Sequence, residues 1–460
     1  MKFKKLTALI TVVTLTFGLA ACGSNKEDAS KKEESKTTIA TEIKEPVTIE
    51  FWHAMNGENE AALKDITEEF NKKNKDKITV KLVYQGHYKE LFSKLDGAAK
   101  SKKLPALTMI YPNRLTAYVM NDLVENLNPY IENEKIGFKK DVWNDIPEFV
   151  RDNGMWNDKH YSLPFNKGTY LLFYNEELLK KYNVKVPTNW DELKEASKKL
   201  TVDTNGDGKN DIYGLGLNSS VGIDSSFWVE QAGGHLIDEA NDKLLFNSKE
   251  GVEAFDFLSG LVKSGNAKIA TEEKYMTGAF SRGEAAMGIC SISALPDIIK
   301  ACKGNNINFK TAVLPEGKKK AALFSGTDVA IFNTPSSEEK LAAFEYLKFF
   351  MEKESQTKWA TKSGYLPLRK SVADSKEFKD YVEKENPAKG EAVKEFDYGY
   401  CDPKVLNGYA IHDNMAKALD EIIDGKKDSK QALGDAEKKA RQELDEAKKA
   451  FGKYKRMKKL

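Results

Sequence analysis

Cysteine and net charge are both scarce in this sequence. Its four cysteines, Cys22, Cys290, Cys302 and Cys401, have no CxxC spacing, so neither a disulfide framework nor a thiolate metal site is indicated, although one pair could still form. The formal net charge is only +2, and three of the lysines lie in the first five residues. The rest of the chain therefore presents no net basic field, and nucleic acid is not an expected partner.

Sequence motifs for catalysis are also missing. The chain has no Gly-rich phosphate loop, no HExxH and no GxSxG, and it shows no internal repeat. We therefore assign no catalytic residue and expect no required cofactor. A secreted glycoside hydrolase would need two carboxylates about 5 to 10 Å apart across a cleft. With 70 acidic residues that pairing stays open as an alternative, and turnover of a sugar would distinguish an enzyme from a binding protein.

The N-terminal residues 1–21 have the pattern of an export signal. Three lysines precede an apolar run over 6–19, and small residues follow before Cys22. The run is short for a membrane-spanning helix, which needs about 20 apolar residues. Leu19-Ala20-Ala21-Cys22 resembles a bacterial lipobox, which implies cleavage before Cys22 and acylation of its thiol. We therefore expect a protein anchored by lipid at the extracellular face of the cell membrane.

The residues that follow predict a linker and then a large folded region. Residues 22–46 are mostly Ser, Lys, Glu, Thr and Ala, with almost no large apolar residue, so this segment is expected to be a flexible tether. More than 400 residues remain beyond it, which is too long for one typical domain. Two lobes are therefore expected.

Strand and helix patterns alternate along the folded region. Alternating apolar residues predict strands at 47–51 and 78–84, and helical spacing predicts a helix between them through Leu63, Ile66 and Phe70. Further units are an apolar run at 107–111, a strand at 170–174 before a helix at 176–182, and 329–332 before a helix at 337–353. This order predicts an α/β fold with largely parallel sheets and ligands at the carboxyl ends of strands. A last helix from about Ser429 carries a narrow, Ala-rich packing stripe.

Seven short segments, in order, resemble the extracellular solute-binding proteins of ABC importers, a family that includes maltose-, multi-sugar- and glycerol-3-phosphate-binding proteins. They are Phe51-Trp52-His53 with Met55 and Gly57, Tyr84-Gln85-Gly86-His87-Tyr88, Pro164-Phe165-Asn166, Phe173-Tyr174-Asn175, Thr188-Asn189-Trp190-Asp191-Glu192-Leu193, Gly283-Glu284-Ala285-Ala286-Met287 and Ser363-Gly364-Tyr365-Leu366-Pro367. The resemblance implies a two-lobed periplasmic-binding-protein-like fold with a hinge and an interlobe cleft. It places residues 47–166 and 322–372 in one lobe, and 167–321 and 373–460 in the other.

The resemblance also implies a mechanism and partners. A small polar solute binds in the cleft, the lobes close on it about the hinge, and the closed form delivers it to the ABC permease subunits. The seven segments are most similar to those of the glycerol-3-phosphate branch, which uses an arginine in the C-terminal segment to bind the phosphate. Ala410 stands near that position, and Pro112 replaces the carboxylate expected after Tyr111. A sugar or polyol is therefore the leading ligand, and glycerol-3-phosphate or a glycerophosphodiester is the alternative.

Carbohydrates bind by stacking on aromatic rings while polar groups satisfy their hydroxyls. The aromatic candidates are Trp52, Tyr88, Tyr111 and Trp228, and the polar candidates are His53, Asn166, Ser291, Ser293, Thr327, Asp328 and Tyr365. Trp228 lies between Ser- and Gly-rich stretches, which favours a cleft loop. His53 has no nearby nucleophile or metal partner in its motif, so we expect it to be a hydrogen-bonding wall residue. For each ring at a strand end, ordinary core packing remains the alternative.

Residues 203–211 carry a separate motif. Side-chain oxygens recur at every second position and Gly208 stands at the sharp turn, as in the first nine residues of a calcium loop. The expected ligands are Asp203, Asn205, Asp207, the Lys209 carbonyl and Asp211. The bidentate glutamate is missing, because Gly214 occupies the twelfth position. The loop therefore predicts either a structural calcium site or a solvated turn before the strand at Ile212.

Overall fold

The computed structural model describes residues 39–222 and 224–457, and the side chains as far as residue 450. The predicted signal at 1–21, Cys22 and the tether up to residue 38 lie outside the described residues. The folded unit begins at Ile39, earlier than the expected boundary at Val47. Ile39, Ala40 and Ile43 pack against the core, and the Lys44 amide donates to the Glu338 carboxylate at 3.0 Å. These few apolar residues order the last part of the segment predicted as a tether.

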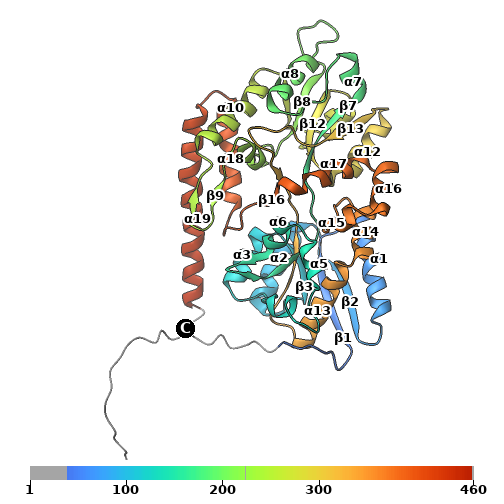
Figure 1. Ribbon diagram of the computed structural model, residues 1–460. Coiled ribbons are helices and arrows are strands. Elements are labelled where there is room, and N and C mark those ends of the chain that lie inside the picture. Colours follow the sequence, from blue (N-terminus) through green and yellow to red (C-terminus); the bar gives the residue numbers. More distant parts are fainter. Residues whose placement is uncertain (1–38, 223, 458–460) are drawn as a thin grey trace, which may run out of the picture. The chain divides into compact units, whose positions relative to one another are not determined.

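The first lobe is built on a five-stranded sheet, drawn at the blue end of the colour scale in Figure 1 together with one orange strand. Its order is β2 (Ile78–Tyr84), β1 (Val47–His53), β3 (Leu107–Ile110), β15 (Asp328–Ile331) and β6 (Ser162–Pro164). In β1 the buried residues are Ile49, Phe51 and His53, which follows the predicted alternation. The Phe51 ring meets Tyr346 and Phe165 in the core of this lobe.

The first lobe is completed by helices and short elements. They are α1 (Gly57–Lys73), α2 (Tyr88–Ser101), α3 (Pro112–Met120), α4 (Asn128–Ile131), α5 (Lys140–Asn144), α6 (Glu148–Arg151), η1 (Asp152–Gly154), β4 (Met155–Trp156), β5 (Lys159–His160), α13 (Ser337–Phe350), α14 (Lys353–Lys362) and α15 (Lys370–Ala373). The helix predicted over 337–353 begins at a capping box of Ser336 and Glu339 and ends at Phe350, and α14 follows as a separate helix.

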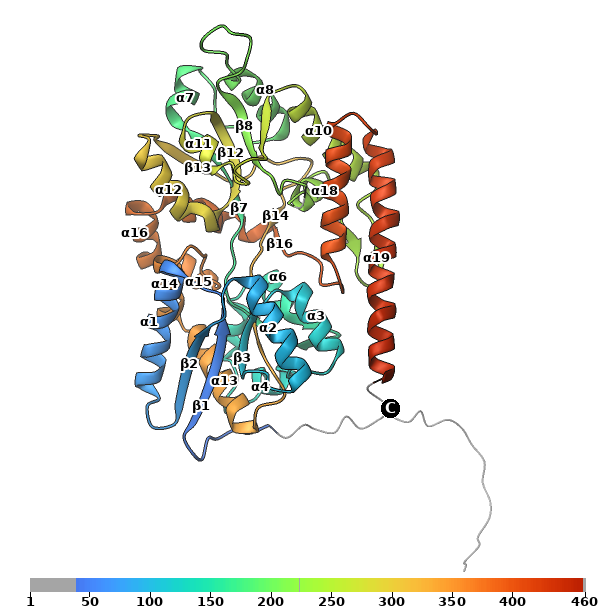
Figure 2. The ribbon, with the colours of Figure 1, turned by 180° about the vertical axis from the view of Figure 1, so that it is seen from behind.

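The second lobe is built on another five-stranded sheet, coloured green to yellow in Figures 1 and 2. Its order is β11 (Ala267–Ala270), β8 (Tyr213–Asn218), β12 (Ala285–Ser291), β7 (Tyr170–Asn175) and β13 (Phe309–Ala312). Around it lie α7 (Glu176–Lys181), α8 (Trp190–Leu200), α9 (Ser226–Gln231), β9 (Ile237–Asp238), β10 (Lys243–Leu244), α10 (Lys249–Lys263), α11 (Thr277–Ser281), η2 (Ile292–Ala294), α12 (Leu295–Gly304), α16 (Lys376–Lys384), α17 (Pro387–Val393), η3 (Lys394–Tyr398), α18 (Tyr409–Ile423) and α19 (Ser429–Met457).

The C-terminal helix α19 packs side by side with α18 (Figure 2). Its predicted stripe is buried in the core of the second lobe from Leu433 to Leu444. Charged residues cover much of the rest of the helix. Among the described residues, no helix is both long and apolar enough to cross a bilayer.

Each sheet mixes parallel and antiparallel neighbours, so the expectation of largely parallel sheets is wrong. In the first sheet β1 pairs in parallel with β2 and β3, whereas β15 is antiparallel to β3 and β6. The second sheet repeats this division, with β7 antiparallel to β12 and β13. The antiparallel pairing follows from the edge at which the chain enters each sheet. Strands β15 and β7 begin where the chain crosses from the other lobe, so each starts at the edge where the parallel strands end.

Two chain segments that cross between the lobes are hydrogen-bonded to each other, and the second-lobe segment at β16 is hydrogen-bonded to one of them. The Gly168 and Ser325 backbones exchange two bonds of 3.0 Å, and the Phe324 amide donates to the Tyr400 carbonyl at 2.8 Å. Strand β14 (Ala322–Leu323) pairs with β16 (Gly399–Tyr400). A Cβ on Gly326 would lie 1.7 Å from the Asn166 carbonyl oxygen, so the close approach of two crossing segments requires glycine there.

A buried ion pair joins two of these crossing segments. Lys167 Nζ lies 2.8 Å from Asp328 Oδ1, with 1% and 0% of the two residues exposed. The Ser162 hydroxyl donates to the second Asp328 oxygen at 2.7 Å. Burial alone would lower the pKa of the Lys167 ammonium, but the Asp328 carboxylate outweighs it and the pKa is raised. The pair is therefore charged and compensated inside the hinge.

Two other ionisable groups lie buried beside the crossing segments. Glu395 accepts a hydrogen bond from the Thr169 hydroxyl at 2.6 Å, and burial raises the pKa of this carboxyl to about 8. Lys389 Nζ donates to the Ser363 carbonyl at 2.6 Å and to that of Ala360, and burial lowers the pKa of its ammonium to about 7. Burial in the hinge therefore shifts the pKa of both groups towards their neutral forms.

Replacing Asp328 by asparagine should destabilise the protein strongly, because it leaves the Lys167 cation buried without its counter-charge. We expect Asp328→Asn to lower the free energy of unfolding by about 3 to 5 kcal/mol in urea titrations. The control is Asp380→Asn, which breaks a surface pair with Lys376 whose side chains are 41% and 86% exposed, and should change the stability far less because the pair is solvated. Equal losses in the two variants would contradict a structural role for the buried pair.

Candidate functional site

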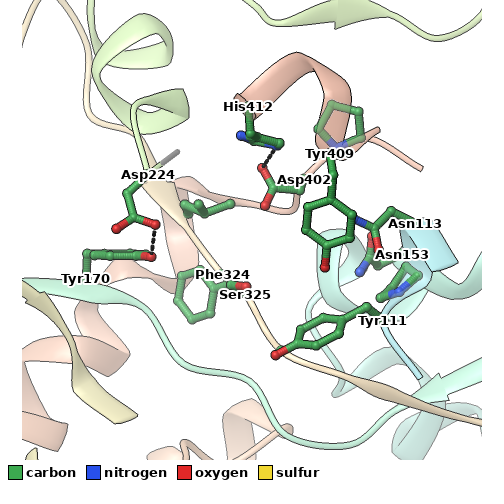
Figure 3. Close-up of a pocket in the computed structure, with 14 residues that line it drawn as sticks. Tyr111, Asn113, Asn153, Tyr170, Asp224, Phe324, Ser325, Asp402, Tyr409 and His412 are labelled. Carbon is green, nitrogen blue, oxygen red and sulfur yellow. Dashed lines mark hydrogen bonds and ion pairs between the residues drawn. The ribbon is translucent and has the colours of Figure 1, made fainter. Parts of the chain in front are cut away.

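A cavity of about 180 Å³ lies between the two lobes, against the crossing segments (Figure 3). The first lobe contributes residues around β3 and η1, and the second lobe contributes β7, the segment before α9, the segment after β16 and the first turn of α18. The remaining residues, 323–326, come from a crossing segment. The lining consists of Tyr111, Pro112, Asn113, Asn153, Tyr170, Asp224, Leu323, Phe324, Ser325, Gly326, Asp402, Pro403, Tyr409 and His412. A solute in this cavity would touch both lobes.

Local sequence explains why these side chains reach the cavity. Strand β3 ends at Ile110, and Pro112 starts helix α3 because its fixed φ suits the first helical position. Tyr111 is the residue between them, at the carboxyl end of the strand. Tyr170 is the first residue of β7, where the chain enters the second lobe. Both rings therefore stand at the sheet edges that face the hinge.

Asp224 is the carboxylate on the second-lobe side of the cavity. It accepts hydrogen bonds of 2.7 Å from the Tyr170 and Ser220 hydroxyls, and Figure 3 shows the bond to Tyr170. Burial raises the pKa of the Asp224 carboxyl, and the negative charge of Asp402 adds to this effect. Burial likewise raises the pKa of the Tyr170 hydroxyl well above its usual range. The site therefore holds a carboxylate whose charge is poorly compensated.

Asp402 and His412 form a second polar group above the cavity in Figure 3. His412 Nε2 lies 3.7 Å from Asp402 Oδ1. The Tyr409 ring lies beside them, and burial raises the pKa of its hydroxyl. The lining contains no lysine and no arginine.

Five of the residues predicted from the sequence lie together next to the cavity. Asn166 Oδ1 accepts from the Thr327 amide at 2.6 Å and from its hydroxyl at 2.7 Å, while Asn166 Nδ2 donates to the Tyr88 hydroxyl at 3.3 Å. The Tyr88 and Tyr111 ring centroids are 5.1 Å apart. Burial raises the pKa of Tyr88, and a hydrogen bond with Tyr365 opposes the shift. Of this cluster, Tyr111 is the member that lines the cavity.

Trp52 and His53 lie at the end of β1 and are not among the lining residues. The Trp52 indole donates to the Glu50 carboxylate at 2.9 Å. His53 is buried beside Tyr84, with ring centroids 5.8 Å apart, and burial lowers the pKa of its imidazole. Its Nδ1 makes no hydrogen bond with the described residues. The structure therefore does not bring these two residues to the cavity.

Trp228 was expected in a cleft loop, but it lies in helix α9 with 1% of its surface exposed. Its ring packs against Trp190, Phe227 and Phe257 in the core of the second lobe. The Gly- and Ser-rich flanks that suggested a loop instead surround a short buried helix. Trp228 is therefore a core residue, as the alternative of ordinary core packing predicts.

Three predicted residues remain, and none of them lines the cavity. Asp328 is committed to the ion pair with Lys167 inside the hinge. Ser291 ends β12 and its hydroxyl lies 3.0 Å from that of Ser293, but neither serine lines the cavity. Tyr365 stacks on Trp359 with ring centroids 5.7 Å apart and planes at 5°. This stacking fixes the ring that meets Tyr88.

Several lining residues had no signal in the sequence analysis. Asp224 and Asp402 lie in irregular segments before α9 and after β16, and Asn113 and Asn153 in short helical elements. Tyr409 lies in the segment 407–411, where the resemblance implies an arginine, and His412 follows that segment. A search of this segment for aromatic and ionisable residues, and not for arginine alone, could have found both.

The loop at 203–211 is held by its own side chains. Asp203 accepts from the amides of Gly206 at 2.7 Å and Gly208 at 2.8 Å, and Asp211 accepts from the Thr204 amide at 2.7 Å. These hydrogen bonds lower the pKa of both carboxyls. In the part of the chain that the structure describes, no three His, Cys, Asp or Glu side chains are arranged to hold a metal ion. Calcium in this loop stays a prediction.

The chain was compared with known families and proteins. The family described as "Bacterial extracellular solute-binding protein" matches residues 65–386. The chain is similar to the sn-glycerol-3-phosphate-binding periplasmic protein UgpB of Brucella melitensis, at 25% identity over 432 residues that cover 87% of this chain and 94% of that protein. It is also similar to the UgpB of Rhizobium meliloti, at 25% identity over 406 residues, or 84% and 91% of the two chains.

Solved structures show the same fold. The cyclic alpha-maltosyl-1,6-maltose binding protein from Arthrobacter globiformis superposes with a TM-score of 0.76 at 22% identity, covering 87% of this chain and 99% of that chain. UgpB from Mycobacterium tuberculosis, in complex with glycerophosphocholine, gives a TM-score of 0.72 at 20% identity, with 87% and 99% covered. The two-lobed α/β fold predicted from the sequence is confirmed.

Replacing Asp224 by asparagine should stabilise the empty protein at neutral pH. Because the folded-state pKa of Asp224 is raised, stability is lost as the pH rises above the pKa of the unfolded chain. The asparagine side chain carries no charge to desolvate, so we expect Asp224→Asn to raise the melting temperature at pH 7 by about a degree or more, and by less at pH 4. Calorimetry at both pH values measures this, with Asp374→Asn as the control, since the Asp374 side chain is 78% exposed. A lower melting temperature at both pH values would contradict it.

Proposed function

Since the chain belongs to the bacterial extracellular solute-binding proteins, we propose that it is the substrate-binding component of an ABC importer, which binds a carbohydrate or polyol between its lobes and delivers it to the permease subunits. The cavity between the lobes carries this proposal. Aromatic rings from Tyr111, Tyr170 and Tyr409 line it together with carboxylates, hydroxyls and amides. Rings can stack on sugar faces while polar groups bind the hydroxyls.

The lining favours a neutral solute over a phosphate. A phosphate dianion needs charge-assisted donors, and arginine or lysine supplies them in most phosphate sites. The lining has neither, and Ala410, near the position of the expected arginine, is buried with 3% exposed. Asp224 and Asp402 would instead repel an anion. Both can accept hydrogen bonds from sugar hydroxyls.

Glycerol-3-phosphate or a glycerophosphodiester remains the second candidate, because the similar curated proteins bear the name of that ligand class. One observation favours it. Arg114 lines a larger cavity of about 680 Å³ that shares Asn113 and Tyr409 with the first. The Arg114 guanidinium lies over the Phe92 ring, 5.1 Å from its centroid. A long phosphodiester lying across both cavities could reach it.

The proposed mechanism is closure of the two lobes about the crossing segments. The solute contacts both lobes only in the closed form, so its differential affinity shifts the population towards closure. We propose no chemical step for this chain. Turnover of a bound sugar would instead support the hydrolase alternative.

We further propose that export is followed by acylation at Cys22, which anchors the protein at the extracellular face of the cell membrane. The export pattern at 1–21 and the segment Leu19-Ala20-Ala21-Cys22 support this. We also propose that the loop at 203–211 holds a structural calcium ion. The alternation of oxygen-bearing side chains supports that assignment.

A ligand screen tests the binding proposal. Thermal-shift assays of residues 39–460 with sugars, polyols, glycerol-3-phosphate and glycerophosphodiesters should show a rise in melting temperature with a neutral sugar or polyol, because the solute binds only the folded state. Tyr111→Ala should then raise the Kd for that solute by about 10-fold or more in calorimetric titrations. The control is Tyr275→Ala, since Tyr275 is 60% exposed and outside the cavity.

A response to phosphorylated compounds alone would replace the leading ligand class by the second. An unchanged Kd in Tyr111→Ala would remove Tyr111 from the site. The same assay with calcium and with a chelator tests the loop at 203–211, where calcium should raise the melting temperature of the unmodified protein but not of Asp203→Asn. An equal response in both would place the ion elsewhere.

Cell fractionation tests the lipid anchor. Replacing Cys22 by alanine removes the thiol to be acylated, so we expect the variant to appear in the medium or soluble fraction while the unmodified protein stays with the membrane. The control is Cys401→Ala, which leaves the N-terminal segment intact and should stay with the membrane. Membrane retention of the Cys22→Ala variant would contradict acylation at this residue.

A further inference from the structure

The cavity between the lobes carries an excess of negative charge. Among its lining residues, the groups that can be charged near neutral pH are Asp224, Asp402 and His412. Even with His412 protonated beside Asp402, at 3.7 Å, one carboxylate remains without an opposite charge in the lining. Asp402 Oδ1 accepts no hydrogen bond from the described residues. The two carboxylates also sense each other, since Asp402 contributes to the raised pKa of Asp224.

Three basic side chains near the cavity have other contacts. The Arg114 guanidinium follows the lining residue Asn113 and acts on Tyr409, but it lies over the Phe92 ring in the adjoining cavity. Lys404 Nζ donates to the carbonyls of Asp152 at 3.0 Å and Met155 at 2.9 Å, and lies over the Trp156 ring. Lys167 is paired with Asp328 inside the hinge. Lys167 also senses the negative charge of Asp402. None of the three lines the cavity, so its wall has no lysine or arginine of its own.

Aromatic ring faces add to the negative electrostatic potential in the cavity. Tyr111, Tyr170, Phe324 and Tyr409 line the cavity together with the two carboxylates. Figure 3 shows Tyr111 and Tyr409 on one side and the Tyr170–Asp224 pair on the other, with Asp402 between them. The face of an aromatic ring carries negative charge density and attracts cations. Rings and carboxylates surrounding a small space are the chemistry that binds an ammonium group.

We propose that the solute carries a positively charged nitrogen on a polyhydroxylated framework, as an amino sugar or amino polyol does. The inference rests on the proposed solute-binding function and specifies its ligand class. The nitrogen lies between Asp224 and Asp402, and the hydroxyls meet the asparagines and tyrosines. A neutral sugar would fill the same hydrogen bonds but would leave the carboxylates buried without counter-charge when the lobes close. A charged nitrogen makes charge-assisted bonds, which are about twice as strong as neutral ones.

Matched pairs of compounds test this. We would titrate the mature chain at pH 7 and constant ionic strength with glucose and glucosamine, galactose and galactosamine, and glycerol and 2-amino-1,3-propanediol. In at least one pair the amine should bind about 10-fold or more tightly than its neutral partner. Asp402→Asn should reduce that preference to about threefold or less. Asp374→Asn, an exposed carboxylate outside the cavity, should leave it unchanged.

The outcomes separate this inference from the function on which it rests. Binding of a neutral member at least as tight as that of its amine, in every pair that binds, would overturn the charged ligand and keep the solute-binding function. An amine preference that survives in both Asp402→Asn and Asp224→Asn would also overturn it, because the carboxylates would not be its cause. Absence of binding to these pairs, while the wider screen yields a neutral or phosphorylated ligand, overturns the inference alone. No binding to any compound overturns both.

Discussion

The buried pair of Lys167 and Asp328 is the constraint on which the hinge depends. It joins two crossing segments at a point where neither residue meets water, and its neighbours Asn166 and Thr327 hold Tyr88 through the amide side chain. A charge pair at such a depth tolerates little displacement, because separating the charges exposes each of them to a poorly polarisable surrounding. We therefore expect the proposed closure of the lobes to keep this ion pair together.

Ionisable groups are compensated differently in the hinge and in the cavity. In the hinge, Lys167 has its counter-charge, and burial shifts the pKa of Glu395 up to about 8 and that of Lys389 down to about 7. In the cavity, burial raises the pKa of Asp224, and the lining that it shares with Asp402 contains no lysine or arginine. A binding site commonly holds groups that are unfavourable until the ligand arrives, and the rest of the fold supplies the stability to keep them there.

The fold was accessible from the sequence, whereas most of the site was not. Period-2 patterns predicted β1 and β2, and the segments that carry the resemblance contain Asn166, Tyr365 and Tyr88, which the structure brings together. Trp228 shows the limit, because composition around a residue does not reveal which side of a short helix is buried. Asp224 and Asp402 lie 178 positions apart in irregular segments, and the tertiary fold of the second lobe brings them to one cavity. No local pattern encodes that proximity.

The position of β15 has a consequence for how the chain folds. This strand lies between β3 and β6 in the first sheet and pairs Asp328 with Ile110, although the whole second sheet lies between those residues in sequence. The first lobe therefore cannot complete its sheet during synthesis until all strands of the second sheet have been made. Pairing at such separation closes a long loop before any contact repays its entropy, which slows folding. The two lobes are thus coupled kinetically, and an N-terminal fragment that ends before β15 would present an unpaired edge of β3 to other chains.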